Sequence, residues 1–424
     1  MVTYLSRLID QELAELLPSL AAIALEGPKG VGKTATGVRH AATCIALDDP
    51  AQRELLAANP QRLETDQTPI FLDEWQRYPE VWDLVRRSVD DNPAGGRFLL
   101  AGSATPLNPP THSGAGRIVR LRMRPLSLAE RLPGHATVSL SALLNPTRAT
   151  IGGDAEYTLA DYTHDVLSSG FPAIASLPER ARRLQLDGYL DRLAEHDFPE
   201  QGHPVRRPAA LRSWLAAYAA ATSTTASYNA ILDAATPGES DKPSKVTTTA
   251  YRDILTQLWL IDDVPAWTPP GSEFTRLGQA PKHHLADPAL AARLLNVTDT
   301  MLLRGVAPDA DAFSATSLLG RLFESLVTMG VKVYAQSCDA AVYHLRDRGG
   351  EHEVDLVVQA PDGQILALEI KLTRSVTDAD TRHLHWLARS LGDKLADAAV
   401  ITTGPYAYRR TDGIAVIPAV LLGS

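Results

Sequence analysis

The apolar residues of the first third of the chain follow two alternating patterns. Short, nearly continuous apolar runs lie at residues 21–25, 45–48, 69–72 and 97–103, and each has the length of a buried strand. Between these runs, apolar residues recur every three or four positions, at 5–17, 33–43, 51–59 and 81–89, which is the spacing of a helix face. Strands that alternate with helices predict an α/β domain with a parallel sheet.

Helical patterns dominate the middle of the chain. Loops rich in proline, glycine and serine around residues 132–156 indicate a boundary, and long helical stretches follow, among them 188–197 and 211–219. Residues 227–267 predict a helix, a polar loop, a second helix and a short apolar strand. That order is typical of a winged helix, which would suit DNA binding, but a purely structural helical domain explains it equally well.

The last third of the chain combines one strongly apolar helix, at residues 318–327, with a group of strands. The alternation of apolar and polar residues predicts strands at 341–345, 353–359 and 365–372, and a turn at 361–363 joins the last two into a hairpin. A helix at 378–391 would cover this sheet. We therefore expect three domains, at residues 1–135, 136–281 and 282–424.

Composition narrows the class of protein. The chain has 424 residues, of which 45% are hydrophobic and 21% charged, as expected for a soluble globular protein of several domains. No apolar run has membrane-spanning length, and no signal peptide precedes the first helix, so we expect no membrane partner. The distant cysteines Cys44 and Cys338 favour a cytoplasmic location. A net charge of -9 excludes a uniformly basic surface but leaves room for a local basic groove that binds nucleic acid.

The strongest chemical signal follows the first apolar run. It has the form GxxxxGK[ST] and consists of Gly27, Pro28, Lys29, Gly30, Val31, Gly32, Lys33 and Thr34. Glycines at Gly30 and Gly32 allow a tight turn whose N–H groups point inward, toward the phosphates of a nucleotide. Lys33 should reach the β- and γ-phosphates and Thr34 should bind Mg²⁺, so the sequence predicts an ATP site.

Two later strand ends should complete this site. Asp73 and Glu74 end the apolar run that begins at Pro69, where Asp73 would hold Mg²⁺ and Glu74 would polarise the attacking water. Ser103 ends the next run and is the candidate sensor of the γ-phosphate. The alternative is an ordinary polar turn at each strand end.

Three arginines alternate with apolar residues just beyond. Arg120, Arg122 and Arg124 would share one face of a strand, with Val119, Leu121 and Met123 on the core face. Such a row could contact phosphates or the nucleotide of a neighbouring subunit. A solvated polar face is the simpler interpretation.

A second group of chemical residues lies in the last third. Strand alternation places Asp355 on one face of its strand, and Glu369 and Lys371 on one face of the next, so that pairing can bring them together with Glu324 on the preceding helix. Carboxylates with a lysine suit Mg²⁺ or Mn²⁺ that activates water against a phosphodiester. The pattern alone is loose, and a surface hairpin could show it. The histidines His283, His284, His383 and His385 lack metal-ligand spacing and are interpreted as surface or packing residues.

Taken together, these features resemble a family of bacterial and archaeal AAA-type ATPases with a C-terminal domain related to PD-(D/E)xK nucleases. The matching blocks, in family order, are GPKGVGKT, PIFLDEWQRYPE, LLAGSATP, GRIVRLRMRPLSLAERL, SSGFPAI, YLDRLAEHDFPE, LLGRLFESLV, HEVDLVV and LALEIKL. The resemblance implies an α/β chain with a RecA-like P-loop ATPase core, a helical or winged-helix middle and a restriction-endonuclease-like C-terminal domain. It also implies that Arg117 senses nucleotide or acts on a neighbouring subunit. The nuclease roles would fall on Glu324, Asp355, Glu369 and Lys371.

The leading hypothesis from the sequence is an ATP-hydrolysing protein coupled to a metal-dependent nuclease that acts on single- or double-stranded DNA. Its cofactors would be ATP and Mg²⁺, with Mn²⁺ as an alternative metal at the nuclease site. A second hypothesis is an ATP-dependent switch that binds nucleic acid or protein without cutting. A third is a homo-oligomer that translocates a protein substrate.

Overall fold

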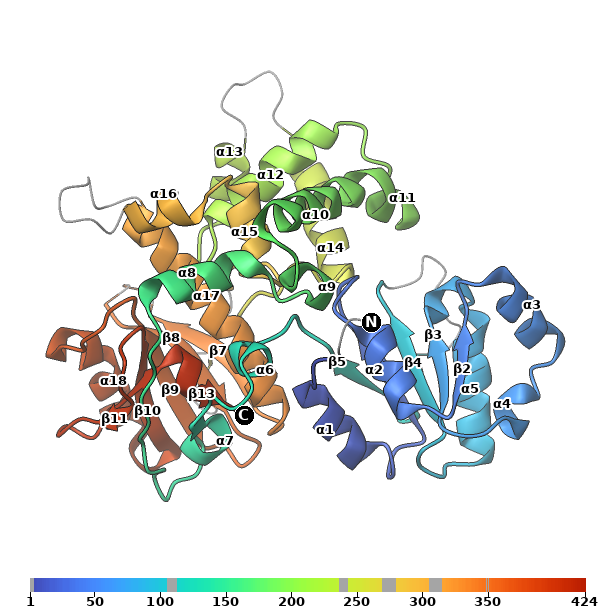
Figure 1. Cartoon of the computed structure of the whole chain (residues 1–424), viewed down its shortest axis with the longest axis horizontal. Helices are drawn as coiled ribbons and strands as arrows, with labels where there is room; N and C mark the ends of the chain where they lie inside the picture. Colours follow the sequence, from blue (N-terminus) through green and yellow to red (C-terminus); the bar gives the residue numbers. More distant parts are fainter. Residues whose placement is uncertain are drawn as a thin grey trace.

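The computed structural model describes residues 4–104, 113–235, 243–268, 280–304, 315–347, 349 and 351–424, with the side chains of 315–317 left aside. Figure 1 shows an N-terminal α/β part in blue, a helical part in green and yellow, and a C-terminal α/β part in orange and red. The helical part lies above the other two in this view, and contacts both.

The N-terminal sheet is entirely parallel and has the strand order β2-β3-β4-β1-β5. Its strands are β1 (Ala22–Glu26), β2 (Thr43–Ala46), β3 (Ile70–Asp73), β4 (Phe98–Gly102) and β5 (Ile118–Arg122). The helices around it are α1 (Leu8–Leu16), α2 (Lys33–His40), α3 (Pro50–Ala58), α4 (Arg62–Thr65) and α5 (Glu80–Asp91), with a 3-10 turn η1 at Trp75–Arg77. The α/β class and the parallel sheet predicted from the apolar runs are therefore confirmed.

The order of strands brings distant residues to one edge of this sheet. Strand β4 lies between β1 and β3, and all three run in the same direction. The segment 27–34 follows β1, Asp73 ends β3 and Ser103 follows β4, so all of them lie at the carboxyl edge, where open parallel sheets bind ligands.

Strand β5 departs from the predicted pattern. Leu121 and Met123 are buried as expected, but Val119 is 38% exposed and Ile118 is buried instead. Strand β5 is an edge strand with β1 as its neighbour in this sheet, so fewer groups surround the start of the strand at Val119 than its later residues Leu121 and Met123.

The middle of the chain is helical. Its helices are α8 (Leu159–Ser168), α9 (Pro172–Ala175), α10 (Glu179–Arg192), a π-turn η2 (Leu193–Asp197), α11 (Phe198–Glu200), α12 (Pro208–Ala220), α13 (Tyr228–Ala234), α14 (Lys245–Gln257), α15 (Pro288–Leu294) and α16 (Asp299–Arg304). Helix α15 packs against α8, α10 and α12, so residues 288–294 lie with the helical part although the sequence places them after the boundary at 282.

The winged-helix hypothesis receives limited support from the described residues. After α14 the chain forms isolated bridges, Ile261 with Leu285 and Val264 with Lys282, where a wing would need a regular hairpin. Most of the polar loop expected between the two helices, residues 236–242, lies outside the described residues.

The C-terminal part contains a mixed sheet in the order β11-β12-β10-β9-β8-β7. Its elements are α17 (Ala315–Gln336), β7 (Ala341–Arg346), β8 (Glu353–Gln359), β9 (Ile365–Ile370), α18 (Asp378–Leu391), η4 (Gly392–Lys394), β10 (Leu395–Thr402), β11 (Tyr408–Arg409), β12 (Ala415–Pro418) and η5 (Ala419–Leu421). Strands β7, β8 and β9 are antiparallel neighbours, and β10 runs parallel to β9 after the crossover through α18.

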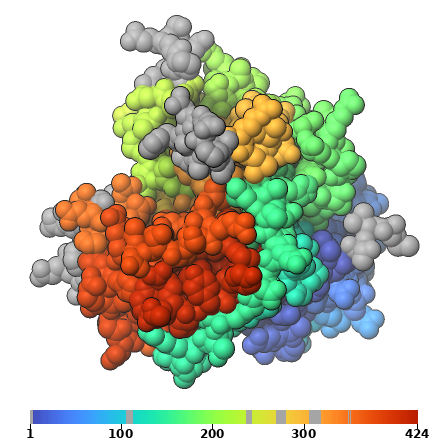
Figure 2. Space-filling view, turned by 60° about the vertical axis from the view of Figure 1, so that its left-hand side comes forward, coloured from blue at the N-terminus to red at the C-terminus, as the bar shows by residue number. Residues whose placement is uncertain are grey.

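Residues 136–158 lie with this C-terminal part, whereas the sequence predicts that they belong to the middle domain. After α6 (Leu128–Arg131), strand β6 (Val138–Ser139) pairs with β13 (Leu422–Gly423), and α7 (Leu140–Leu143) packs against α17. Farther along, the N–H of Ala155 donates to the carbonyl of Pro405 at 2.8 Å. Figure 2 shows the teal segment lying against the red C-terminal surface.

No helix among the described residues is long and apolar enough to cross a membrane. The cytoplasmic location stays a prediction.

Candidate functional site

The loop between β1 and α2 requires glycine for steric reasons. Gly32 has φ +106°, a conformation that side chains disfavour, and it precedes the first residue of α2. A Cβ added to Gly27 would lie 2.2 Å from the carbonyl oxygen of Met123. The loop therefore adopts a tight turn that ends at the N-terminus of α2, where backbone N–H groups and the helix dipole favour anions.

The side chain of Lys33 lies inside this loop. Its side chain is buried, and its ammonium donates to the carbonyl oxygens of Gly27 and Pro28 at 2.8 and 2.9 Å. Burial lowers the pKa of Lys33 to about 8, against the opposing effect of Glu74 and Asp73. Since both hydrogen-bond partners are neutral carbonyls, a phosphate would be a better partner for this ammonium.

The two carboxylates lie beside the loop at the end of β3. The side chain of Thr34 hydrogen-bonds to Asp73, whose pKa is raised chiefly by burial. The Oε2 atom of Glu74 accepts from the hydroxyl of Ser103 at 3.1 Å and also from the side-chain amide of Gln76. The structure thus brings Thr34, Asp73, Glu74 and Ser103 together around Lys33, and their roles stay predictions.

The sequence did not single out Arg7, which supports the loop from outside. The Arg7 guanidinium is 4% exposed and donates to the carbonyl of Val31 at 2.9 Å and to Glu130 at 3.0 Å. It holds the loop to the start of α6. No sequence signal marks it, because an isolated arginine before a helix is common.

Lys29, within the same loop, is held by the helical part of the chain. Its ammonium lies 2.5 Å from Asp197 and 3.1 Å from Glu200. Glu200 also pairs with Arg77, three residues after Glu74, at 3.0 Å. Asp197 and Glu200 therefore connect the two halves of the candidate ATP site to η2 and α11.

A second contact joins the loop to the helical part. A Cβ built on Gly30 would lie 3.9 Å from the ring of Phe171, which stacks on Tyr189 with 5.2 Å between ring centroids. The hydroxyl of Tyr189 in turn donates to the carbonyl of Lys29 at 3.3 Å.

Arg117 lies away from this site. It immediately precedes β5, and the parallel pairing of Ala22 with Ile118 places it at the amino edge of the sheet, opposite the loop. Its guanidinium pairs with Asp90 at 2.8 Å. Sensing of the nucleotide bound to its own chain is therefore incompatible with this position, and action on a neighbouring copy stays a prediction.

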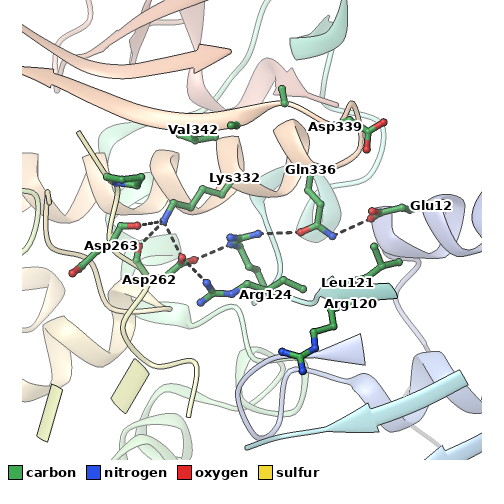
Figure 3. A pocket seen from close by; sticks show the side chains of 14 residues that line it. Glu12, Arg120, Leu121, Arg124, Asp262, Asp263, Lys332, Gln336, Asp339 and Val342 are labelled. Atoms are coloured by element: carbon green, nitrogen blue, oxygen red, sulfur yellow. Dashed lines mark hydrogen bonds and ion pairs between the residues drawn. The ribbon is translucent and has the colours of Figure 1, made fainter. Parts of the chain in front are cut away.

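Arg120 is largely exposed and lies 3.3 Å from Glu26, as a solvated face would have it, whereas Arg122 and Arg124 have a different use from either one expected. Figure 3 shows Arg124 and a neighbouring guanidinium converging on Asp262, with Lys332 on the other side. The distances from the Asp262 carboxylate are 2.8 Å to Arg124, 3.0 Å to Arg122 and 2.9 Å to Lys332. Although its burial acts in the opposite direction, these cations hold the pKa of Asp262 well below its usual range. Arg122 and Arg124 thus form an internal ion cluster that joins β5 to the helical part and α17.

The four residues predicted from the last third do converge. The Lys371 ammonium lies 2.8 Å from Glu369 and 3.8 Å from Asp355. The Asp355 carboxylate also accepts a hydrogen bond from the N–H of Ile370 at 2.9 Å. Glu324, on α17, belongs to the same group because it shares an ion-pair partner with Asp355.

That partner is Lys282, which the sequence did not identify. Its ammonium is 2.8 Å from Glu324, 3.0 Å from Asp355 and 3.6 Å from Glu353, and its side chain is 1% exposed. An isolated lysine, 42 positions before Glu324, carries no local signal of this contact. We call the set Lys282, Glu324, Asp355, Glu369 and Lys371 the carboxylate cluster.

Charge and burial act strongly on this cluster. Burial raises the pKa of Glu324 to about 7 against the effect of Lys282, and burial together with Asp355 raises the pKa of Glu369 well above its usual range. Despite burial, Lys282 and Lys371 lower the pKa of Asp355. The neighbouring His283 and His284 are buried. Of the two roles predicted for them, packing is therefore confirmed and a surface position is wrong.

Comparisons with known families match three separate stretches of the chain. Residues 20–132 match the model of an AAA domain family, residues 159–301 match a domain of unknown function, DUF8612, and residues 319–422 match another, DUF4143. The N-terminal part is therefore an AAA-type P-loop ATPase domain, and the resemblance to AAA-type ATPases is confirmed to that extent. The nuclease-like nature of the C-terminal part is not confirmed.

Similar proteins add little about function. The chain is 26% identical over 409 residues to the uncharacterised proteins Mb2031c of Mycobacterium bovis and Rv2008c of Mycobacterium tuberculosis, covering 94% of this chain and 80% of each relative. Among solved structures, the Holliday junction branch migration motor RuvB of Thermotoga maritima matches with 16% identity and a TM-score of 0.27 over 62% of this chain and 90% of RuvB. Protein VC1899 of Vibrio cholerae matches with 12% identity and a TM-score of 0.19 over 95% of each chain. Similarity at these TM-scores defines no shared fold.

Proposed function

We propose that this protein is an ATP-dependent switch, in which the AAA-type domain binds and hydrolyses ATP and thereby changes the position of the helical part against the C-terminal domain. The observation that carries the proposal is the pairing of Lys29 and Arg77 with Asp197 and Glu200. Both cations flank the nucleotide site, and both are held by the same short segment of the helical part. Filling the site therefore disturbs that segment.

The residues at the loop fit ATP with Mg²⁺. The N–H groups of the loop and the Lys33 ammonium would bind the phosphates, and the paired Thr34 and Asp73 supply the oxygen donors that Mg²⁺ prefers. Mg²⁺, when bound, would neutralise charge that develops on the phosphates. Glu74 would orient the attacking water, and Ser103, which donates to Glu74, would hold that carboxylate in place.

The segment around Phe171 lies between the nucleotide loop and the stretch of chain that carries Lys282. Phe171 packs over Gly30, and the two residues before Phe171 both donate to buried Asp287, from Ser169 at 2.5 Å and from the N–H of Gly170 at 2.7 Å. Asp287 stands five positions after Lys282 in a short segment that leads into the cluster. We propose that movement at the loop is transmitted toward the C-terminal domain through this segment.

Hydrolysis is tested with Lys33→Ala, which removes the phosphate-binding ammonium, and Glu74→Gln, which removes the carboxylate that orients water. We expect Lys33→Ala to weaken ATP binding, and Glu74→Gln to bind ATP while losing about 10²–10⁴-fold in turnover. Unchanged hydrolysis in both variants would refute the assignment of the site. Arg183→Ala serves as the control, since its exposed guanidinium pairs with Glu179 within α10.

The second candidate is the Mg²⁺- or Mn²⁺-dependent DNA nuclease predicted from the sequence. It is favoured by the convergence of Glu324, Asp355, Glu369 and Lys371, and by the arrangement of β7, β8, β9, α18 and β10. Carboxylate oxygens are the donors that a hard cation prefers, but the Lys282 ammonium already pairs with Glu324 and Asp355. Incubation of single- and double-stranded DNA with Mg²⁺ or Mn²⁺, with and without ATP, tests it against a Lys371→Ala control. Cutting that disappears in the variant would support a nuclease, and intact DNA would support the switch.

A further inference from the structure

One oxygen of Glu324 and one of Asp355, the pair that a metal would bridge, already share a cationic partner, whereas Oε1 of Glu369 is buried without a hydrogen-bond partner among the described residues. The Lys282 ammonium lies 2.8 Å from Oε1 of Glu324 and 3.0 Å from Oδ1 of Asp355. The second oxygen of Asp355 accepts the N–H of Ile370, and Oε2 of Glu369 pairs with Lys371 at 2.8 Å. A divalent cation bound to Glu324 and Asp355 would share both carboxylates with a buried ammonium.

Lys282 is firmly held in this position. Its backbone N–H donates to the carbonyl of Val264, and its backbone carbonyl accepts the N–H of Val264, both at 2.9 Å. The next residue is also fixed, because the N–H of His283 donates to the carbonyl of Thr224 at 2.9 Å. With 1% of its side chain exposed, Lys282 cannot turn toward solvent without opening the packing around it.

The charges of the surrounding side chains also favour a permanent ammonium group at the position of Lys282. Three carboxyl groups, on Glu324, Glu353 and Asp355, lie within 3.6 Å of the Lys282 ammonium, and the fourth, on Glu369, pairs with Lys371. Buried carboxylates need a cation close by, because an unpaired buried charge is strongly unfavourable. Lys282 meets that need from within the chain.

We propose that Lys282 is the built-in cation of the carboxylate cluster, so that this cluster takes no divalent metal ion and supports no metal-dependent cleavage. The ammonium occupies the place between Glu324 and Asp355 that a metal ion would fill. This inference goes beyond the proposed ATP-dependent switch and does not depend on it, since it concerns a site remote from the nucleotide loop.

Mn²⁺ binding tests the proposal directly. Purified full-length protein without nucleotide is titrated with Mn²⁺ while free Mn²⁺ is followed by its electron paramagnetic resonance signal. We expect wild type and Asp355→Asn to bind Mn²⁺ equally weakly. A wild-type site that weakens about 10–100-fold in Asp355→Asn would overturn the proposal, because it would show that Asp355 ligates a metal ion beside Lys282.

Removal of Lys282 provides the second arm. In Lys282→Ala the carboxylates lose their cation, and we expect a new Mn²⁺ site that disappears again in Lys282→Ala with Asp355→Asn. The exposed Lys245→Ala serves as a matched control and should gain no site. A folded Lys282→Ala protein that binds no more Mn²⁺ than wild type would contradict the claim that the ammonium stands in the metal position. If Lys282→Ala does not fold, the comparison of wild type with Asp355→Asn decides alone.

Thermal unfolding gives a readout independent of activity. Wild-type Tm should not change with Mn²⁺ in the absence of nucleotide. The Tm of Lys282→Ala should fall below that of wild type and rise again when Mn²⁺ is added, since ligands that bind the folded state stabilise it. A rise in wild-type Tm that Asp355→Asn abolishes would refute the proposal.

Discussion

The contact of Lys29 with Asp197 and Glu200 leads to a quantitative prediction for the double variant Asp197→Asn with Glu200→Gln. In the structure these carboxylates pair with an ammonium that lies within the phosphate loop, and with Arg77 just beyond Glu74. Burial opposes the charge on Lys29, yet the two carboxylates raise its pKa overall. The triphosphate must compete with them for Lys29, so their removal should strengthen ATP binding.

The size of the effect follows from exposure. The Lys29 side chain is 37% exposed, while Asp197 is 10% and Glu200 40% exposed. Solvent screening limits such pairs to about 0.2–1 kcal/mol each, with the more buried Asp197 pair near the upper end. The two pairs together give about 1–1.5 kcal/mol, which corresponds to a decrease of roughly five- to thirteenfold in Kd for ATP.

Isothermal titration of ATP with Mg²⁺ into wild type and the double variant measures this difference. It should shrink at high salt, because exposed ion pairs are screened. Asp191→Asn is the matched control, since Asp191 lies on the same stretch of helix but pairs with Arg212 away from the loop. Equal or weaker ATP binding by the double variant would refute the competition, and would indicate that the two carboxylates position Lys29 for the phosphates.

Three further predictions concern stability and the loop. Asp262→Asn should destabilise the fold by about 3–5 kcal/mol in urea unfolding, because it leaves Arg122, Arg124 and Lys332 facing a neutral amide; a loss below about 1 kcal/mol would contradict a buried ion cluster. Because the folded-state pKa of Asp262 is depressed, its contribution to the free energy of unfolding is complete above about pH 4 and is lost as pH falls toward the folded-state pKa. Wild type should therefore lose stability on acidification more steeply than Asp262→Asn. Parallel plots of unfolding free energy against pH for the two proteins would contradict this. Gly27→Ala should lower the free energy of unfolding by about 1–3 kcal/mol and impair ATP binding, since the new Cβ would lie 2.2 Å from the backbone oxygen of Met123. Gly188→Ala is the control and should be tolerated, because its Cβ would meet nothing within 4 Å. Equal effects of the two substitutions on Tm would argue against the steric requirement at Gly27.

The sequence was most informative where the signal is local. The parallel sheet followed from short apolar runs, and the ATP site from eight consecutive residues, because both patterns arise from neighbouring positions. The convergence of Asp355, Glu369 and Lys371 was also predictable, since strand alternation fixes which side chains share a face.

What the sequence missed depends on contacts between distant segments. Lys282 enters the carboxylate cluster from an irregular stretch paired with Val264, and no periodicity marks it. The ion cluster at Asp262 likewise joins β5 to residues more than a hundred positions away. Strand β6 spans only two residues, so its pairing with β13, which places residues 136–158 beside the C-terminal sheet, has no signature in the apolar pattern.

The exchange of backbone amide hydrogens in residues 189–200, compared with and without a non-hydrolysable ATP analogue, tests the proposed switch most directly. This segment carries Tyr189, Asp197 and Glu200, which hold Lys29 in the structure. We predict faster exchange there when wild type is saturated with the analogue, and no change in Lys33→Ala. Unchanged exchange in saturated wild type would contradict the claim that nucleotide binding is transmitted from the phosphate loop to the helical part.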